Sequence, residues 1–310
     1  MKILVTGGMG FQGSHLAQKL YELGHKVAVL NTSTPQALAN QKYLKEKAEI
    51  IWGSVTDAEV TGKAMRGKDV VFHLGARVNV DESILHPWET FAVNLRGTFN
   101  VLEAARKTGS RIIYASSCEV YGRPTSEAPV AETAELRPMS PYAASKAAAD
   151  RLGFAYFQTY KTPITILRFF NIFGERQKEG NFGAVIPIFV ERAMRGEALE
   201  VFGDGEQTRD YLHISDALGA YCSALEHPEL SGEAINFGTG LGTRIKDIAE
   251  YIAKKFNGKV RYTAARPGEA TGMIADFSKA KRLLGWEPKV GIYEGIDRYI
   301  VWRTAENHIS

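Results

Sequence analysis

Short apolar runs alternate with longer amphipathic segments over roughly the first half of the chain. The runs are rich in Val and Ile and lack strict alternation of buried and exposed positions, which is typical of parallel strands covered on both faces. They are Ile3–Val5, Val27–Leu30, Ile50–Trp52, Val70–Leu74, Arg111–Ala115 and Ile164–Phe169. The amphipathic segments predict helices over Phe11–Leu23, Trp88–Thr108 and Tyr142–Tyr160. This alternation predicts an α/β fold with a doubly wound parallel sheet.

The pattern loosens in the second half of the chain. Clusters of Gly, Asn and Asp at 174–183, 203–205 and 238–242 separate shorter helical segments. We therefore expect a nucleotide-binding domain over 1–170, with segments near 208–235 returning to it, and a smaller interleaved α/β lobe over 171–310.

Composition narrows the class of protein. The 38 Lys and Arg against 35 Asp and Glu leave a net charge of +3, which argues against a nucleic-acid-binding protein. No apolar stretch approaches the roughly 20 residues of a membrane span. The two cysteines, Cys118 and Cys222, make neither a disulfide framework nor a zinc site, and no His/Asp/Glu cluster has metal-ligand spacing. We expect a cytoplasmic protein with no metal, no membrane segment and structural roles for His73 and His213.

A glycine-rich turn follows the first apolar run. Gly7, Gly10 and Gly13 are spaced by three, and the segment containing Phe11 and Gln12 opens the first predicted helix. Glycines allow a tight turn and close approach of a pyrophosphate, and the helix N-terminus offers N–H groups to the phosphates. A strand, this turn and a helix in that order predict dinucleotide binding.

The end of the second predicted strand bears on the choice of cofactor. Many NAD sites place an acidic residue there to bind the adenosine ribose, whereas this chain has Asn31 and Thr32. Asn31 can still bond a ribose hydroxyl, but it lacks the charge that repels a 2′-phosphate. NAD is the expected cofactor, and NADP stays open because Asn31 replaces the acidic residue.

A second motif supplies acid–base chemistry. Tyr142 and Lys146 lie four residues apart after Ser140-Pro141, so they share one face at the start of a helix. A nearby ammonium and a cationic nicotinamide favour the phenolate form of a tyrosine, which ordinarily has a pKa near 10. Tyr142 can then take the proton of an alcohol while the cofactor takes a hydride.

Together these motifs resemble the extended short-chain dehydrogenase/reductase family that acts on nucleotide sugars. Further matching motifs run along nearly the whole chain: His73-Leu74-Gly75-Ala76, Asn94-x-x-Gly97-Thr98, Ser116–Gly122, Arg168-Phe169-Phe170-Asn171-x-x-Gly174, Gly203-Asp204-Gly205-x-x-x-Arg209-Asp210, Asn236-x-Gly238-x-Gly240 and Arg266-Pro267-Gly268-Glu269. The resemblance implies a Rossmann-like domain for NAD(P) and a C-terminal lobe for a UDP- or dTDP-sugar. It also implies a homodimer through helices near 88–108 and 142–160.

The resemblance assigns further binding residues. Cofactor contacts fall on the glycine turn, Asn31, Thr32, Tyr142 and Lys146, and additionally on Val55, Asp57, Leu74, Ala76, Asn94 and Phe169. Substrate contacts fall on Asn171, Arg209 and Arg266 for the diphosphate and on Val185 and Phe202 for the base, with uracil preferred over thymine. Val185 and Phe202 as plain core residues, and Arg209 as a partner of Asp210, remain the alternatives.

The segment Ser117-Cys118-Glu119 bears on the reaction. Ser117 matches the family residue that bonds the reacting hydroxyl, and an acid followed by Glu resembles the dehydratase pattern. After oxidation at C4, a Glu119 carboxylate can remove the C5 proton while the Cys118 thiol protonates the departing C6 hydroxyl. The string most resembles the tunicamycin-pathway UDP-GlcNAc 5,6-dehydratases, which return the hydride to C4, whereas 4,6-dehydratases deliver it to C6.

Other interpretations of the same residues remain open. Ser117, Tyr142 and Lys146 alone suffice for a UDP-hexose 4-epimerase, in which Cys118 only packs and Glu119 at most binds a hydroxyl. Decarboxylases also use a Glu here, but their tyrosine motif usually reads Tyr-Asp-x-x-Lys-Arg. A catalytically silent dinucleotide-binding regulator is disfavoured by the presence of all three redox residues. The dehydratase is the favoured prediction.

Overall fold

The computed structural model describes residues 1–123, 128–177, 185–265 and 272–307. The chain divides into two compact units, one made of 1–122, 135–168 and 218–235, the other of 123–134, 169–217 and 236–310. These bounds differ from the expected ones at 123–134 and at 208–217, both of which belong to the second unit. Contacts within the second unit hold residues near 216. There the Asp216 carboxylate accepts from the backbone N–H groups of Lys289 and Val290.

The first unit begins with alternating strands and helices. They are β1 (Lys2–Thr6), α1 (Phe11–Glu22), β2 (Lys26–Asn31), α2 (Pro35–Leu44), β3 (Ala48–Trp52), α3 (Ala58–Met65), β4 (Val70–His73), α4 (Val80–Leu85), α5 (Pro87–Phe91), a π-helical turn η1 (Ala92–Arg96), α6 (Gly97–Thr108), β5 (Arg111–Ser117), a 3₁₀ turn η2 (Cys118–Tyr121) and α7 (Pro141–Tyr160). All six predicted strands are present. The helix predicted over Trp88–Thr108 is instead α5, η1 and α6 in succession.

Later elements complete the sheet and build the second unit. They are β6 (Ile164–Phe169), β7 (Ile172–Phe173), α8 (Val185–Met194), β8 (Leu199–Phe202), β9 (Thr208–Arg209), β10 (Leu212–His213), α9 (Ile214–Glu226), η3 (Pro228–Leu230), β11 (Ala234–Phe237), β12 (Thr243–Arg244), α10 (Ile245–Lys255), β13 (Val260–Thr263), α11 (Ser278–Leu284) and α12 (Ile292–Asn307).

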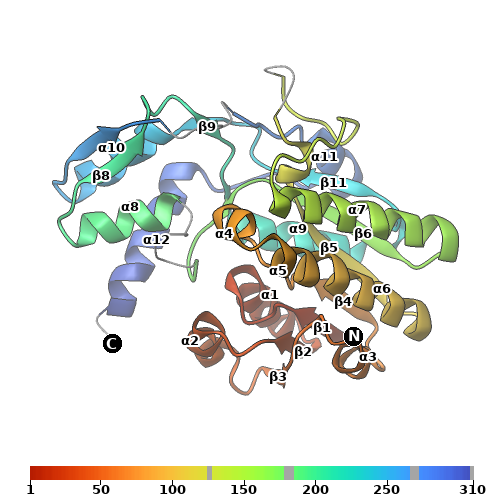
Figure 1. Cartoon of the computed structure of the whole chain (residues 1–310). Coiled ribbons are helices and arrows are strands. Elements are labelled where there is room, and N and C mark those ends of the chain that lie inside the picture. Colours follow the sequence, from red (N-terminus) through yellow and green to blue (C-terminus); the bar gives the residue numbers. More distant parts are fainter. Residues whose placement is uncertain (124–127, 178–184, 266–271, 308–310) are drawn as a thin grey trace. The chain divides into compact units, whose positions relative to one another are not determined.

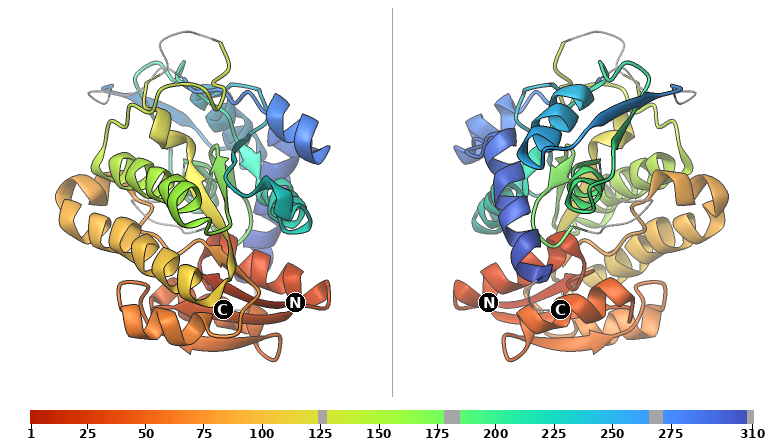
Figure 2. Two further views of the ribbon diagram at one scale, coloured as in Figure 1. Left: turned by 90° about the vertical axis from the view of Figure 1, so that its right-hand side faces the viewer. Right: turned by 90° about the vertical axis from the view of Figure 1, so that its left-hand side faces the viewer.

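One seven-stranded sheet has the order β11-β6-β5-β4-β1-β2-β3, with parallel pairing. Helices α3, α6 and α7 pack against one another on one face, and α1 lies on the other (Figures 1 and 2). On that second face the Tyr221 hydroxyl of α9 donates to Gln12 of α1 at 2.8 Å. Both faces are thus covered, which explains why the strands read as continuous apolar runs. The prediction of a doubly wound parallel α/β sheet is confirmed.

The second unit has its own core. Its strands form three pairs, β10–β7, β12–β9 and β13–β8. Helix α10 buries Ile245, Ile248, Ala249 and Ile252, which are spaced by three or four residues and so share one face. These side chains pack with buried residues of α8, β8 and α12 in one cluster.

Candidate active site

The glycine turn joins β1 to α1. The backbone of Gly7 has φ +69°, and a Cβ there would lie 2.8 Å from the Gly75 nitrogen. A Cβ on Gly13 would lie 2.1 Å from the Gly7 carbonyl oxygen, whereas one on Gly10 would meet only that oxygen, at 3.2 Å. Packing therefore demands the outer glycines, and a side chain at Gly10 would also be tight, although less so. No side chain caps the start of α1 at Gly10, and its first turn carries no acidic residue, so this end fits the pyrophosphate of a dinucleotide.

Two side chains at the end of β2 lie beside this turn. The Asn31 Oδ1 accepts from the Met9 backbone N–H at 3.0 Å, and its Nδ2 donates to the Thr32 carbonyl at 2.9 Å. The Thr32 side chain is exposed. Asn31 thus holds the glycine turn in place, a role that its position alone does not reveal.

Val55 and Asp57 precede α3. Asp57 caps that helix by accepting from the backbone N–H groups of Glu59 and Val60 at 2.9 and 3.0 Å. Val55 is buried, and its carbonyl accepts from the Asn100 side chain at 2.8 Å. The hydrogen bonds of Val55 and Asp57 fix the loop that the cofactor is expected to contact.

The loop after β4 contains Leu74 and Ala76, both half-buried. Asn94, in the π-helical turn, accepts from the Arg77 backbone N–H at 2.8 Å and donates to the Arg77 carbonyl at 2.9 Å. It also donates to Ser145 Oγ of α7 at 2.9 Å. Asn94 therefore ties this loop to the helix that carries Tyr142, and its amide is engaged within the protein.

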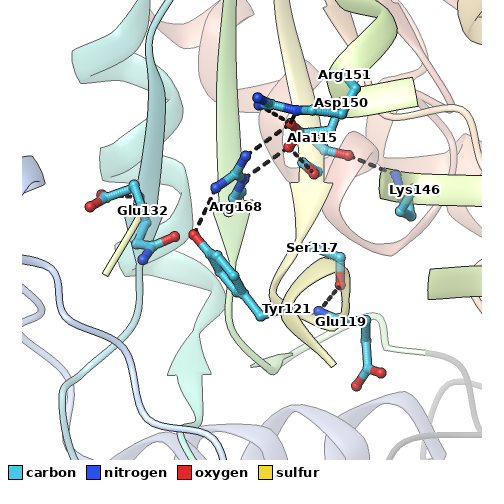
Figure 3. A network of polar contacts seen from close by, with 11 residues as sticks. Ala115, Ser117, Glu119, Tyr121, Glu132, Lys146, Asp150, Arg151 and Arg168 are labelled. Carbon is cyan, nitrogen blue, oxygen red and sulfur yellow. Dashed lines mark hydrogen bonds and ion pairs between the residues drawn. The ribbon is translucent and has the colours of Figure 1, made fainter. Parts of the chain in front are cut away.

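Three predicted catalytic residues lie where β5 ends. The Ser117 Oγ accepts from the Glu119 backbone N–H at 3.2 Å and so caps the 3₁₀ turn (Figure 3). Cys118 is buried at 4% exposure, and Glu119 is half-buried. This edge of a parallel sheet is where α/β proteins place their ligands.

Tyr142 lies in the first turn of α7. Burial raises the pKa of its phenol, a hydrogen bond with Ser117 lowers it, and the nearby charges of Glu119 and Cys118 raise it. The backbone N–H of Tyr142 donates to Ser83 Oγ of α4 at 3.0 Å. Ser117, Cys118 and Glu119 thus all lie near enough to Tyr142 to act on its pKa.

Lys146 lies one turn further along α7 than Tyr142. Its ammonium donates to the Ala115 carbonyl of β5 at 2.7 Å and lies 5.0 Å from the centre of the Tyr114 ring. Burial lowers the pKa of Lys146 to about 8, and the charge of Asp150 opposes that change. The ammonium is thus held on the backbone of β5 rather than on the Tyr142 phenol, because a buried carbonyl needs a donor.

His73, at the end of β4, bridges the unit's interior. It hydrogen-bonds Thr6 Oγ1 at 2.7 Å and Thr98 Oγ1 at 3.0 Å, and its ring stacks on Tyr114 with centroids 5.5 Å apart. Burial, with a smaller contribution from Lys146, lowers the pKa of His73 to about 3. These contacts suit the structural role expected of it.

The predicted substrate residues lie in the second unit. The Asn171 side chain donates to the Asp210 carbonyl at 2.9 Å, and Arg209 donates to the Thr208 carbonyl at 2.8 Å. Val185 and Phe202 are half-buried at the start of α8 and the end of β8. Arg266 lies outside the described residues.

Phe169, expected to contact the cofactor, is buried and stacks on Phe237 with centroids 5.4 Å apart. The sequence analysis gave no role to four residues around the catalytic segment: Ser116, Tyr121 and Arg168, which lie in matching motifs, and Asp150, which lies in none of them. The one available signal was spacing, since Asp150 follows Lys146 by four residues.

Among the described residues, no group of three or more His, Cys, Asp or Glu side chains could hold a metal, and no helix has the length and apolar character of a membrane span.

Known proteins share this architecture along nearly the whole chain. The family model described as GDP-mannose 4,6 dehydratase matches residues 4–299. A putative UDP-glucose 4-epimerase from Methanocaldococcus jannaschii is 35% identical over 98% of this chain and 99% of its own length. A UDP-N-acetyl-alpha-D-glucosaminuronate decarboxylase from Bacillus cytotoxicus is 33% identical over 99% of each chain.

Solved structures agree with this assignment. A dTDP-glucose 4,6-dehydratase from Streptomyces venezuelae, determined with NAD bound, has a TM-score of 0.92 and 30% identity, covering 100% of this chain and 98% of that one. The sequence-based prediction of the family is confirmed. The chain belongs to the GDP-mannose 4,6-dehydratase-like family of extended short-chain dehydrogenases/reductases, the NAD-dependent enzymes that include nucleotide-sugar epimerases and dehydratases.

Proposed function

We propose that the protein is a nucleotide-sugar dehydratase that acts on a UDP- or dTDP-hexose such as UDP-GlcNAc. One observation carries this proposal: the Glu119 carboxylate and the Cys118 thiol lie close enough to the Tyr142 phenol for both to act on its pKa. An epimerase needs only a proton acceptor for the C4 hydroxyl. A base and an acid beside that acceptor match the additional demands of an elimination.

Each residue then has a defined task. Tyr142 takes the proton of the C4 hydroxyl, and Ser117 bonds the same oxygen. NAD, when bound, supplies the hydride acceptor. The resulting C4 carbonyl acidifies the C5 proton, which Glu119 removes, while Cys118 protonates the leaving C6 hydroxyl. The hydride is returned to the sugar, so the net change is the loss of one water.

The second candidate is a UDP-hexose 4-epimerase that uses only Ser117, Tyr142 and Lys146. The similarity to the putative UDP-glucose 4-epimerase favours it. In that reaction Glu119 moves no proton, and buried Cys118 serves only packing.

Deuterium exchange separates the two reactions. We expect UDP-GlcNAc, or another member of a panel of UDP- and dTDP-sugars, to lose its C6 oxygen in deuterated water, as followed by NMR. The C5 hydrogen is replaced by deuterium in a 4,6-elimination and is absent from the product of a 5,6-elimination. Glu119→Gln, which keeps the side chain's shape, is expected to lower dehydration about 100-fold or more, as for loss of a general base. Clean C4 inversion without C5 exchange, unaffected by Glu119→Gln, would overturn the dehydratase proposal in favour of the epimerase.

We propose NAD rather than NADP as the cofactor. Asn31 and Thr32 provide polar groups but no positive charge for a 2′-phosphate. Calorimetric titration with both dinucleotides is expected to give tighter binding of NAD, and Asn31→Asp to weaken NADP binding further by adding a repelling charge. Tighter binding of NADP to the unaltered protein would reverse this assignment.

We propose that the protein is a homodimer. Large apolar side chains are exposed on the helices that the family resemblance assigns to an interface: Trp88 at 77%, Phe99 at 45% and Phe154 at 39%. Sedimentation is expected to show a dimer that Trp88→Glu converts to monomer. Leu241→Glu, which changes a 70% exposed side chain of the second unit, is the matched control. A monomer of the unaltered protein would contradict the proposal.

A further inference from the structure

One face of α7 contacts the carboxyl end of β5 at three successive turns. The face consists of residues spaced by four, which lie above one another along a helix. At the first turn Ser117 lies close enough to Tyr142 to lower the pKa of its phenol. At the second the Lys146 ammonium donates to the Ala115 carbonyl at 2.7 Å, and at the third Ser116 Oγ donates to Asp150 Oδ2 at 2.9 Å. The first two involve the reaction machinery, and the third lies one turn further along.

Asp150 belongs to a buried ion pair. Arg168 of β6 donates to both of its carboxylate oxygens, each at 2.9 Å, and the two side chains are 0% and 2% exposed. Arg151 adds a further bond to Asp150 Oδ1 at 3.0 Å. Burial works to raise the pKa of Asp150, but the hydrogen bonds and charge of Arg168 outweigh it, so the carboxylate is ionised.

Arg168 also contacts the residue that follows the catalytic segment. Its Nη1 donates to the Tyr121 hydroxyl at 2.9 Å, and its guanidinium lies 5.1 Å from the centre of the Tyr121 ring (Figure 3). Ser116 precedes the segment Ser117–Val120 and Tyr121 follows it. Both ends of the segment that carries Ser117, Cys118 and Glu119 are therefore anchored on one ion pair.

We propose that Asp150 and Arg168 are positioning residues, which hold the segment Ser117–Val120 in register with Tyr142 and Lys146. The proposal rests on the proposed function only in requiring Ser117 and Tyr142 to act in the reaction, which holds for the dehydratase and the epimerase alike. A buried ion pair is weak evidence for stability in itself, so its retention calls for such a geometric role.

Single hydroxyl deletions test this role. Replacing Asp150 or Arg168 would leave its partner buried and uncompensated, which strongly destabilises proteins. Ser116→Ala and Tyr121→Phe instead remove the bonds from the ion pair to the segment and leave both members of the pair in place. Ser110→Ala is the matched control, because Ser110 is a buried serine just before β5, at the opposite end of the strand, that donates to the Lys68 carbonyl at 2.7 Å.

We expect Ser116→Ala and Tyr121→Phe each to lower kcat about tenfold with KM changed less than twofold, and Ser110→Ala to leave both within twofold. Amide hydrogen exchange in the substrate-free protein, followed by mass spectrometry, is expected to speed up at residues 116–122 in the first two variants only. A merely structural pair would lower the melting temperature of Ser116→Ala and Tyr121→Phe without this selective pattern in kcat and hydrogen exchange.

The outcomes separate this proposal from the proposed function. If the product is C4-inverted, the dehydratase proposal fails, and kcat for inversion then reports on positioning in the same variants. If no sugar is turned over, the exchange measurement alone decides. Exchange at 116–122 and kcat that match the Ser110→Ala control would overturn the positioning role.

Discussion

The two units hold their predicted functional residues in different ways. In the first unit, Tyr142 and Lys146 lie on a helix of 20 residues, and Ser117 ends a strand of seven. Their contacts follow the period of the helix. In the second unit, Arg209 lies on a two-residue strand and Asn171 lies between strands.

A single carboxylate orders the second unit's loops. Asp210 accepts from the Thr239 backbone N–H and hydroxyl at 2.7 and 2.6 Å, from the Gly240 N–H at 2.9 Å and from the Ala275 N–H at 3.0 Å. These partners are 29 to 65 residues away in sequence. The predicted catalytic residues are thus held by regular elements, whereas the predicted substrate residues lie beside loops that long-range bonds hold together.

Of the substitutions that test this contrast, Tyr142→Phe is expected to change activity most. We expect kcat to fall about 1,000-fold, because the variant lacks the general acid–base group, with KM changed less than threefold. Steady-state assays with the sugar identified above measure both constants. A fall of less than tenfold would mean that the first unit's redox residues do not carry the chemistry.

The elements of the first unit can be predicted from the sequence because each has a signal in its own residues. The six apolar runs correspond to β1–β6, six of the seven strands of the sheet. Ser140-Pro141 marks the start of α7, where Ser140 accepts from the Ala143 N–H at 3.1 Å. The helix expected over Trp88–Thr108 is present without a break, but its middle turn is π-helical. The π-helical turn there inserts Asn94 between the loop after β4 and α7, and such bonds have no local signature.

The contacts that the predicted site residues make could not be read from the sequence. The spacing of Lys146 placed it on the face of Tyr142, but its ammonium satisfies the Ala115 carbonyl, a group that no sequence pattern identifies. Asn31 likewise bonds the Met9 N–H as well as flanking the expected ribose site. The two-residue strands of the second unit could not be predicted, since they exist only through pairing with distant segments.

Asp210→Asn tests whether one carboxylate organises the second unit. An amide offers one acceptor oxygen where the carboxylate offers two, so two buried N–H donors would face an NH₂ group. We expect the free energy of unfolding to fall by about 3 kcal/mol, measured by urea denaturation, with KM raised and kcat retained. Unchanged stability and KM would show that the loops are held by other contacts.

Arg209→Met addresses recognition directly. If Arg209 binds the substrate diphosphate, loss of its charged hydrogen bonds is expected to raise KM about 10- to 100-fold and leave kcat within threefold. Arg261→Met is the matched control, because Arg261 pairs with Glu200 on the exposed side of β13. Equal effects of the two substitutions would argue that the loss is one of general charge.

The smallest expected effect is that of His73, in the first unit, on the pH dependence of stability. Its pKa is lowered to about 3 by burial and by Lys146, so between pH 6.5 and 3 the unfolded chain binds a proton that the folded protein does not. Stability therefore falls as the pH falls, by about 1 kcal/mol for this residue between pH 7 and 5.5. Urea denaturation across this range should show a steeper dependence in the unaltered protein than in His73→Gln, with exposed His86→Gln as the control for losing a histidine. Equal pH dependence in His73→Gln and the unaltered protein would mean that the acid sensitivity lies elsewhere. Burial of His73 would then not explain how the stability of this unit depends on pH.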